Sequence, residues 1–208
     1  RDTGATDFAD SARLAGLLAT FSHPAMNADL IARYVVEGDQ GVRYPYLDPM
    51  GNLSSNNPKN FTRDQLICLA AGLATLGRQD LCLKLYEAAK ARNNRAQNVE
   101  ADIVGSVKEF PNGADILAPS DMNHLRICAG KGGTIFGYSW LIIDIVFNAA
   151  FTRKSEPNQL MCKCKVAGKY AVKLLRLLNW QLDQAIREYW CGWRSEPELS
   201  AYLIENFK

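Results

Sequence analysis

The longest apolar run in the chain spans residues 134–151 and reads TIFGYSWLIIDIVFNAAF. Its length reaches the lower limit for a helix that spans a membrane. However, Asp144 near its centre would cost about 2.5–3.5 kcal/mol on insertion, and Ser139 and Asn148 add further polar groups. A helix that is apolar on every side is otherwise buried by its neighbours. The run therefore predicts a buried central helix, not a membrane span, in which Asp144 and Asn148 are spaced to hydrogen-bond.

Helical spacing also dominates the rest of the chain. Leu14, Leu17, Leu18 and Phe21 form one apolar stripe, which indicates a helix over residues 8–21. Similar patterns and end signals predict helices over 27–37, 63–76, 80–92, a short segment from Ser120, 134–151, 159–180, 181–190 and 198–207. No segment shows the alternation of apolar and polar residues that is typical of strands.

The chain is long enough, and with 48% hydrophobic residues apolar enough, to bury a full core. We therefore predict an all-α fold in which residues 1–208 form a single domain. Its helices, about eight in number, should follow one another as hairpins around the buried central helix.

A long stretch without periodicity, residues 38–61, reads GDQGVRYPYLDPMGNLSSNNPKNF. An irregular segment of this length in a compact domain is usually functional or disordered. Tyr44, Tyr46 and Phe61 favour order, because they offer apolar area that can pack. We expect an ordered loop that lies across the helical body and lines its main cleft.

A strong helix start follows this stretch. Thr62 and Gln65 have the spacing of a capping box, and Phe61 and Leu66 that of a hydrophobic staple. Asp64 then lies in the first turn, where the helix dipole favours a carboxylate. One face of this helix carries small or polar residues, so either another helix approaches it closely or it lines a cleft beneath the loop; these residues are Asp64, Cys68, Ala71 and Thr75.

Carboxylates are the most abundant groups with possible catalytic use. Cleavage of a glycosidic bond needs one protonated and one ionised carboxyl group, roughly 5–10 Å apart. Polysaccharide lyases instead can place Tyr, Arg and His around a sugar acid. The candidate catalytic residues are Asp64, Asp10, Asp39, Asp48 and His124, and the candidate ligand-binding residues are Arg43, Tyr44, Tyr46 and Arg63.

Two of these residues suggest distinct roles. Asp64, at a helix start beside a Tyr-rich segment, suits a base or an acceptor for sugar hydroxyls. Asp10 shares the stripe of Leu14 and Leu17 and is the first candidate for the proton donor. The alternative is structural: Asp64 is a good first-turn residue, and Asp10 pairs with Arg13 or another cation.

Three segments together resemble a known architecture. Asp10-Ser11-Ala12-Arg13, Arg43-Tyr44-Pro45 and the capped Phe61–Leu66 are similar to the hairpin and inner-loop rhythm of α/α-toroid carbohydrate-active proteins. The resemblance covers about a third of the chain and implies a ring of helical hairpins around a cleft. The chain is too short for a complete six-hairpin toroid and matches no family's catalytic motif, so no catalytic residue is carried over.

The sequence predicts neither a metal site nor a cofactor. His23 and His124 are the only histidines, and Cys162-Lys163-Cys164 lacks the spacing of a zinc pair. The glycine-rich residues 130–134 fail the spacing of a phosphate-binding loop. His124 and Cys128 lie one helical turn apart, so a thiol nucleophile with a histidine base is conceivable. His124 also fits a plain role in the cleft or in capping near Asp121.

Charge leaves two alternative functions beside the enzyme. The formal net charge is +2, which does not favour a nucleic-acid partner. A stripe of Lys165, Lys169, Lys173 and Arg176 on the 159–180 helix suggests a binder of anionic surfaces. A non-catalytic helical module that binds a protein partner, such as an inhibitor or adaptor, is the other alternative.

The cysteine pattern bears on localisation. Six cysteines are scattered, mostly in apolar helical contexts where a free thiol acts as a small hydrophobe. This favours a reducing, cytoplasmic compartment, although a secreted protein stays open because the chain begins at Arg1.

Overall fold

A computed structural model describes residues 9–32, 34–35, 62–96, 99–101, 107–109, 116–151, 157–193 and 196–207. The predicted loop over residues 38–61 lies outside these ranges, and with it Asp39, Arg43, Tyr44, Tyr46 and Asp48. The elements are α1 (Ala9–Thr20), α2 (Ala28–Ala32), α3 (Arg63–Thr75), α4 (Gln79–Ala91), β1 (Val99–Ala101), β2 (Val107–Glu109), α5 (Pro119–Cys128), α6 (Ile135–Phe151), α7 (Pro157–Ala167), α8 (Lys169–Leu178), α9 (Leu182–Arg187), the π-helical segment η1 (Glu188–Trp193) and α10 (Pro197–Asn206).

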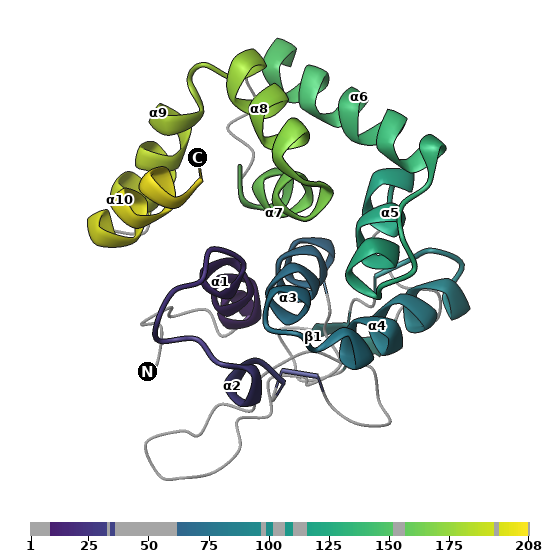
Figure 1. The fold of residues 1–208 in the computed structure, drawn as a ribbon. Coiled ribbons are helices and arrows are strands. Elements are labelled where there is room, and N and C mark those ends of the chain that lie inside the picture. The colour runs from purple at the N-terminus through teal and green to yellow at the C-terminus, as the bar shows by residue number, and fades with distance from the viewer. Residues whose placement is uncertain are drawn as a thin grey trace, which may run out of the picture.

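The all-α fold class is confirmed for the described residues. Three helices, α1, α3 and α7, contact one another in the middle of the molecule. Figure 1 shows α5, α6, α8, α9 and α10 arranged as an arc around these three, with α2 and α4 on the remaining side. The extent of the domain over residues 1–208 stays a prediction, as does the resemblance to a toroid.

A short β-hairpin was not predicted. β1 and β2 pair antiparallel, with Glu100 opposite Lys108, and an isolated bridge joins Arg95 to Ile116. Strands of three residues are too short to show a clear alternating pattern, because alternation needs at least four or so positions to stand out.

The close approach predicted for one face of α3 is confirmed. A Cβ atom added at Gly16 of α1 would lie 2.4 Å from the carbonyl oxygen of Cys68, and one at Gly72 would lie 2.7 Å from that of Gly16. Real side chains do not tolerate such distances to backbone atoms. The backbones of α1 and α3 therefore touch, and glycine is required at both positions.

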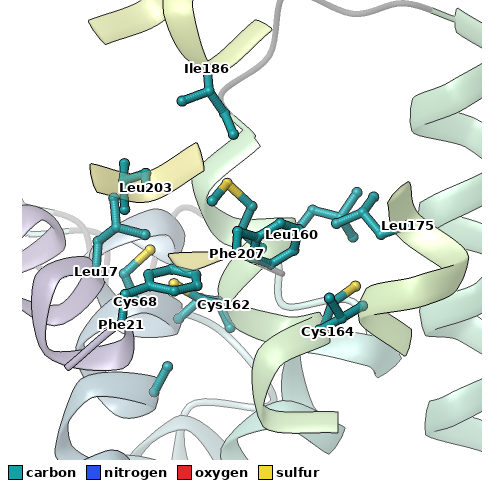
Figure 2. Close-up of a cluster of buried hydrophobic side chains, with 14 of the residues drawn as sticks. Leu17, Phe21, Cys68, Leu160, Cys162, Cys164, Leu175, Ile186, Leu203 and Phe207 are labelled. Carbon is teal, nitrogen blue, oxygen red and sulfur yellow. The ribbon is translucent and has the colours of Figure 1, made fainter. Parts of the chain in front are cut away.

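Two buried clusters fill the interior. One joins α1 and α3 to α2, α4 and α5, around residues such as Leu69 and Leu85. The other lies between α1, α3 and α7 and the helices α8, α9 and α10 (Figure 2). Phe21 and Phe207 meet edge to face there, with ring centroids 5.6 Å apart. Five cysteines, Cys68, Cys82, Cys128, Cys162 and Cys164, are buried as free thiols, which matches their predicted role as small hydrophobes.

The predicted buried central helix is wrong in its placement. The helix exists as α6, but it lies at the periphery of the molecule (Figure 1). Leu141 and Ile145 face the core, whereas Ile135 is 88% exposed and Phe147 58% exposed. Contacts with α5, α7 and α8 cover one side only. An apolar pattern shows which side chains tend to avoid water. It does not show whether other helices pack over them.

No helix in the described part of the chain has the length and apolar character needed to cross a membrane. This agrees with the prediction that residues 134–151 are not a span. Asp144 of α6 also has partners on other helices, Ser120 of α5 and Lys163 of α7.

Two isoleucines of α6, Ile143 and Ile145, differ in burial and should therefore respond differently to substitution. In dilute protein, Ile145→Ala should lower the free energy of unfolding by about 2–5 kcal/mol, because the buried side chain leaves a cavity. Ile143→Ala should change it by less than about 1 kcal/mol, because this side chain is 39% exposed. Urea unfolding followed by circular dichroism measures both. Equal losses for the two variants would contradict the orientation of α6.

The predicted helix over 159–180 is two helices. Gly168 adopts a φ of +105°, a conformation that favours glycine, and separates α7 from α8. Lys165 lies on α7 over the ring of Phe21, with 5.4 Å between its Nζ and the ring centroid. Arg176 donates to the Phe207 carbonyl and to Asp183. The predicted continuous basic stripe is therefore divided between two helices, and its members Lys165, Lys169 and Lys173 are exposed.

Candidate functional site

The start of α3 lies where the sequence predicted it, but its cap differs. Thr62 has the extended backbone of an N-cap residue, yet its side chain makes no capping hydrogen bond. Its hydroxyl donates instead to Asp64 Oδ1 over 2.5 Å. The predicted capping box is thus wrong for Thr62, whose hydroxyl is directed to the Asp64 carboxylate and accepts no backbone N–H of the first turn. Phe61, the predicted staple residue, lies outside the described residues.

Asp64 is held from a second side by a buried arginine. Arg13 of α1, only 1% exposed, places Nη1 3.5 Å from Asp64 Oδ2. Its Nη2 donates to the hydroxyl of Tyr189 over 2.6 Å. The structural alternative, in which Asp10 pairs with Arg13 or another cation, stays a prediction. The backbone of Asp10 lies in α1, and its side chain is outside the description.

Arg63 connects the starts of α3, α5 and α7. Its Nε lies 3.5 Å from Asp121 Oδ2 and donates to Gln159 Oε1 over 3.2 Å. Asp121 Oδ2 also accepts the backbone N–H of Ala118, so the carboxylate closes the first turn of α5. The Arg63 side chain is 43% exposed while the Asp121 side chain is fully buried. Arg63 therefore reaches from solvent to a buried acid.

A buried lysine holds two carboxylates together. Lys163 of α7 is 5% exposed, and its Nζ lies 2.5 Å from Asp121 Oδ1 and 2.9 Å from Asp144 Oδ2. The ammonium also donates to Ser120 Oγ over 3.0 Å. Ser120 in turn donates to Asp144 Oδ2 over 2.5 Å. Charges this deeply buried need such partners, because an unpaired one has a cost on the order of several kcal/mol.

We call these residues the polar cluster: Arg13, Arg63, Asp64, Ser120, Asp121, Asp144 and Lys163. Asp144 was expected to bond Asn148 on its own helix, but its carboxylate is used by Ser120 and Lys163 from other helices. Lys163 was not predicted at all. A signal existed: Asp144 is a lone charge in an apolar run, and buried charges are almost always paired.

His124 lies in the core beneath this cluster. It is 2% exposed, and its Nε2 lies 2.8 Å from the carbonyl oxygen of Ile67, to which it donates. Burial lowers the pKa of His124 to about 4, helped by the charge of Lys163. The imidazole is therefore neutral at pH 7 and ties α5 to α3.

The predicted pairing of His124 with Cys128 exists in space. Cys128 Sγ lies 3.6 Å from His124 Nε2. However, that nitrogen carries the hydrogen that Ile67 accepts, and burial raises the pKa of the Cys128 thiol well above its ordinary value. A thiolate nucleophile needs the opposite environment. The geometry suits a packed structural pair better than a catalytic one.

The depressed pKa of His124 predicts an acid-sensitive fold. Between its ordinary value of 6.5 and about 4, the unfolded chain binds a proton that the folded chain does not. Stability is therefore complete above pH 6.5 and falls by about 3 kcal/mol as the pH drops to 4. Urea midpoints at pH 7.5 and 4.5 measure the loss.

A glutamine at this position serves as the control. Its side-chain amide keeps a donor for the Ile67 carbonyl but does not titrate, so the His124→Gln variant should lose most of the pH dependence in this window. Asp80, whose pKa its partner Arg78 holds at about 2, contributes only at lower pH. An unchanged pH dependence in the variant would contradict the assignment to His124.

Of the predicted site residues, the structure brings Arg63 and Asp64 to one edge of the polar cluster. His124 is nearby but buried in the core. Among the described side chains, no three His, Cys, Asp or Glu groups come close enough to hold a metal ion. Comparison with protein-family models, curated proteins and solved structures finds no significant match to this chain.

Proposed function

We propose that the protein acts on a glycan or a related polar polymer, with Arg63 and Asp64 as its contact residues. One observation carries this proposal. Arg63 and Asp64 are adjacent and partly exposed, and each is fixed by buried partners: Asp64 by Arg13, and Arg63 by Asp121. Side chains held in this way lose little freedom on binding a ligand.

The chemistry of the pair fits sugar hydroxyls. A guanidinium only donates hydrogen bonds and a carboxylate accepts them, so the two together match a diol, which does both. The Asp64 carboxylate, which faces Arg13 and accepts from Thr62, also suits an acceptor for sugar hydroxyls. Hydrolysis needs a second carboxyl group that donates the proton to the leaving oxygen. Asp10, Asp39 and Asp48 remain the proposed candidates for that role.

Two substitutions test the proposal against matched controls. Asp64→Asn and Arg63→Gln should each weaken binding to, or turnover of, a glycan-library ligand by about 10- to 100-fold, because each removes a charged hydrogen-bond partner. Asp80→Asn and Arg78→Gln alter an exposed pair on another helix, 2.9 Å apart, and should have no effect. Array binding and chromatography of the products measure the outcome.

The result is decisive in both directions. If the parent protein binds and cleaves none of the polymers in the library, the proposal is wrong. It is also wrong if an active parent keeps full activity in both Asp64→Asn and Asp10→Asn. Loss of activity in Asp10→Asn alone would place the reacting groups on α1 instead of at the start of α3.

A second candidate function is a non-catalytic module that binds a protein partner. The observation that favours it is the apolar side of α6, which the described part of the chain leaves exposed. If a variant with an altered α6 surface keeps full glycan activity, the α6 surface is not needed for the first candidate function. The two candidate functions can then be tested separately.

A further inference from the structure

The exposed side of α6 is a continuous surface. Seven large hydrophobic residues of this helix are between 39% and 88% exposed: Ile135, Phe136, Tyr138, Ile142, Ile143, Val146 and Phe147. With about 100° between successive residues, they and Ser139 occupy one half of the helix surface. Leu141 and Ile145 lie on the other half, against the core. We call the exposed half the α6 face.

The α6 face carries no charge. Asp144 is the only charged residue between Ile135 and Phe151, and it lies on the core side, bound to Lys163. A charged partner would therefore find no complementary group on this face. A surface identical to itself would bury it without leaving any charge unpaired.

The spacing along the face suits another helix. Ile135, Ser139, Ile142 and Val146 run along its centre at alternating intervals of four and three residues. This is the spacing by which two helices pack at a small crossing angle. The small Ser139 near the middle allows a close approach, and Phe136 and Phe147 flank the line.

The area is sufficient for a dimer. Seven side chains, each roughly half exposed, amount to about 600 Å² per copy if a large side chain offers about 150–250 Å². Stable interfaces bury roughly 600–1,000 Å² on each partner. The α6 face reaches this range by itself.

We propose that the α6 face is the interface between two copies of this chain, related by a twofold axis. In such an isologous contact the same patch serves both copies, so an uncharged, self-complementary surface is the required kind. A lipid surface fits less well, because helices that lie on membranes carry lysine and arginine beside their apolar side. On α6 itself no such residue exists.

The oligomeric state tests this proposal. Light scattering after gel filtration should give twice the monomer mass of 23.1 kDa for the parent protein. Ile142→Glu, at the centre of the face, should weaken dimerisation by about 100-fold or more, as expected for a central interface residue. Because Ile142 is 50% exposed, the variant should keep the parent's circular dichroism spectrum. Tyr170→Glu on α8, at a 77% exposed position, should stay dimeric.

A cross-link provides an independent readout. Cys191 is the exposed cysteine among the described thiols, so Cys191→Ser removes the background. Adding Ile142→Cys should then give a disulfide-linked dimer on air oxidation, whereas Tyr170→Cys should not. A parent that stays monomeric at high micromolar concentration overturns the proposal. So does a dimer that Ile142→Glu leaves intact, or a monomer that sediments with anionic vesicles.

Discussion

Replacing Lys163 by methionine should lower the free energy of unfolding by about 3–5 kcal/mol. The substitution nearly keeps the length and volume of the side chain, so the loss reports the charge. Without the ammonium, the fully buried Asp121 carboxylate keeps Arg63 as its cation, at 3.5 Å instead of 2.5 Å. Leaving a buried carboxylate without its close partner has a cost of this size, about 3–5 kcal/mol.

Two further variants isolate this effect. Lys173→Met alters an exposed lysine on α8 and should leave the free energy of unfolding nearly unchanged. Adding Asp121→Asn to Lys163→Met removes the unpaired charge and should recover part of the loss. Urea unfolding at pH 7 measures all of them. A loss below about 1 kcal/mol for Lys163→Met would mean that water or Arg63 alone satisfies Asp121.

Gly16→Ala should destabilise the protein by about 3 kcal/mol or more, the upper range for overpacking. The added methyl carbon would lie 2.4 Å from the Cys68 carbonyl oxygen, and backbone atoms cannot move aside as a side chain can. Gly72→Ala, with 2.7 Å to the Gly16 carbonyl oxygen, should have a similar effect.

The matched control is Gly192→Ala. No atom lies within 4 Å of a Cβ added at Gly192, so this variant should be neutral or slightly stabilising. Thermal unfolding distinguishes the three variants. If Gly16→Ala melted together with Gly192→Ala, α1 and α3 would have to be further apart than the structure places them.

The helices could be predicted where the local pattern contains the cause. The stripe of Leu14, Leu17 and Leu18 in α1 and the start of α3 at Arg63 follow from spacing and end signals within a few residues. The split between α7 and α8 also had a local signal in Gly168, but a lone glycine does not by itself reveal a left-handed backbone.

Placement depends on partners that are remote in sequence. The apolar pattern of α6 shows a preference to avoid water, whereas its actual cover depends on α5, α7 and α8. Lys163 meets Asp121 across 42 positions of the chain, which no spacing rule predicts. Thr62 does not cap α3: its hydroxyl donates to Asp64 and accepts no backbone N–H, an orientation that the capping motif does not specify. For the candidate site, Arg63 and Asp64 were named from the sequence, but the buried groups that fix them were not.

The polar cluster has an equal number of positive and negative side chains. Arg13, Arg63 and Lys163 face Asp64, Asp121 and Asp144 across contacts of 2.5–3.5 Å. The electric fields of opposite charges this close cancel at distances beyond roughly one Debye length, about 8 Å at physiological salt. The cluster therefore neither draws a charged polymer from solution nor repels one, and encounter with a ligand should be almost independent of ionic strength. Under the proposed function, selection would therefore occur only on contact, through the directions in which Arg63 donates and Asp64 accepts.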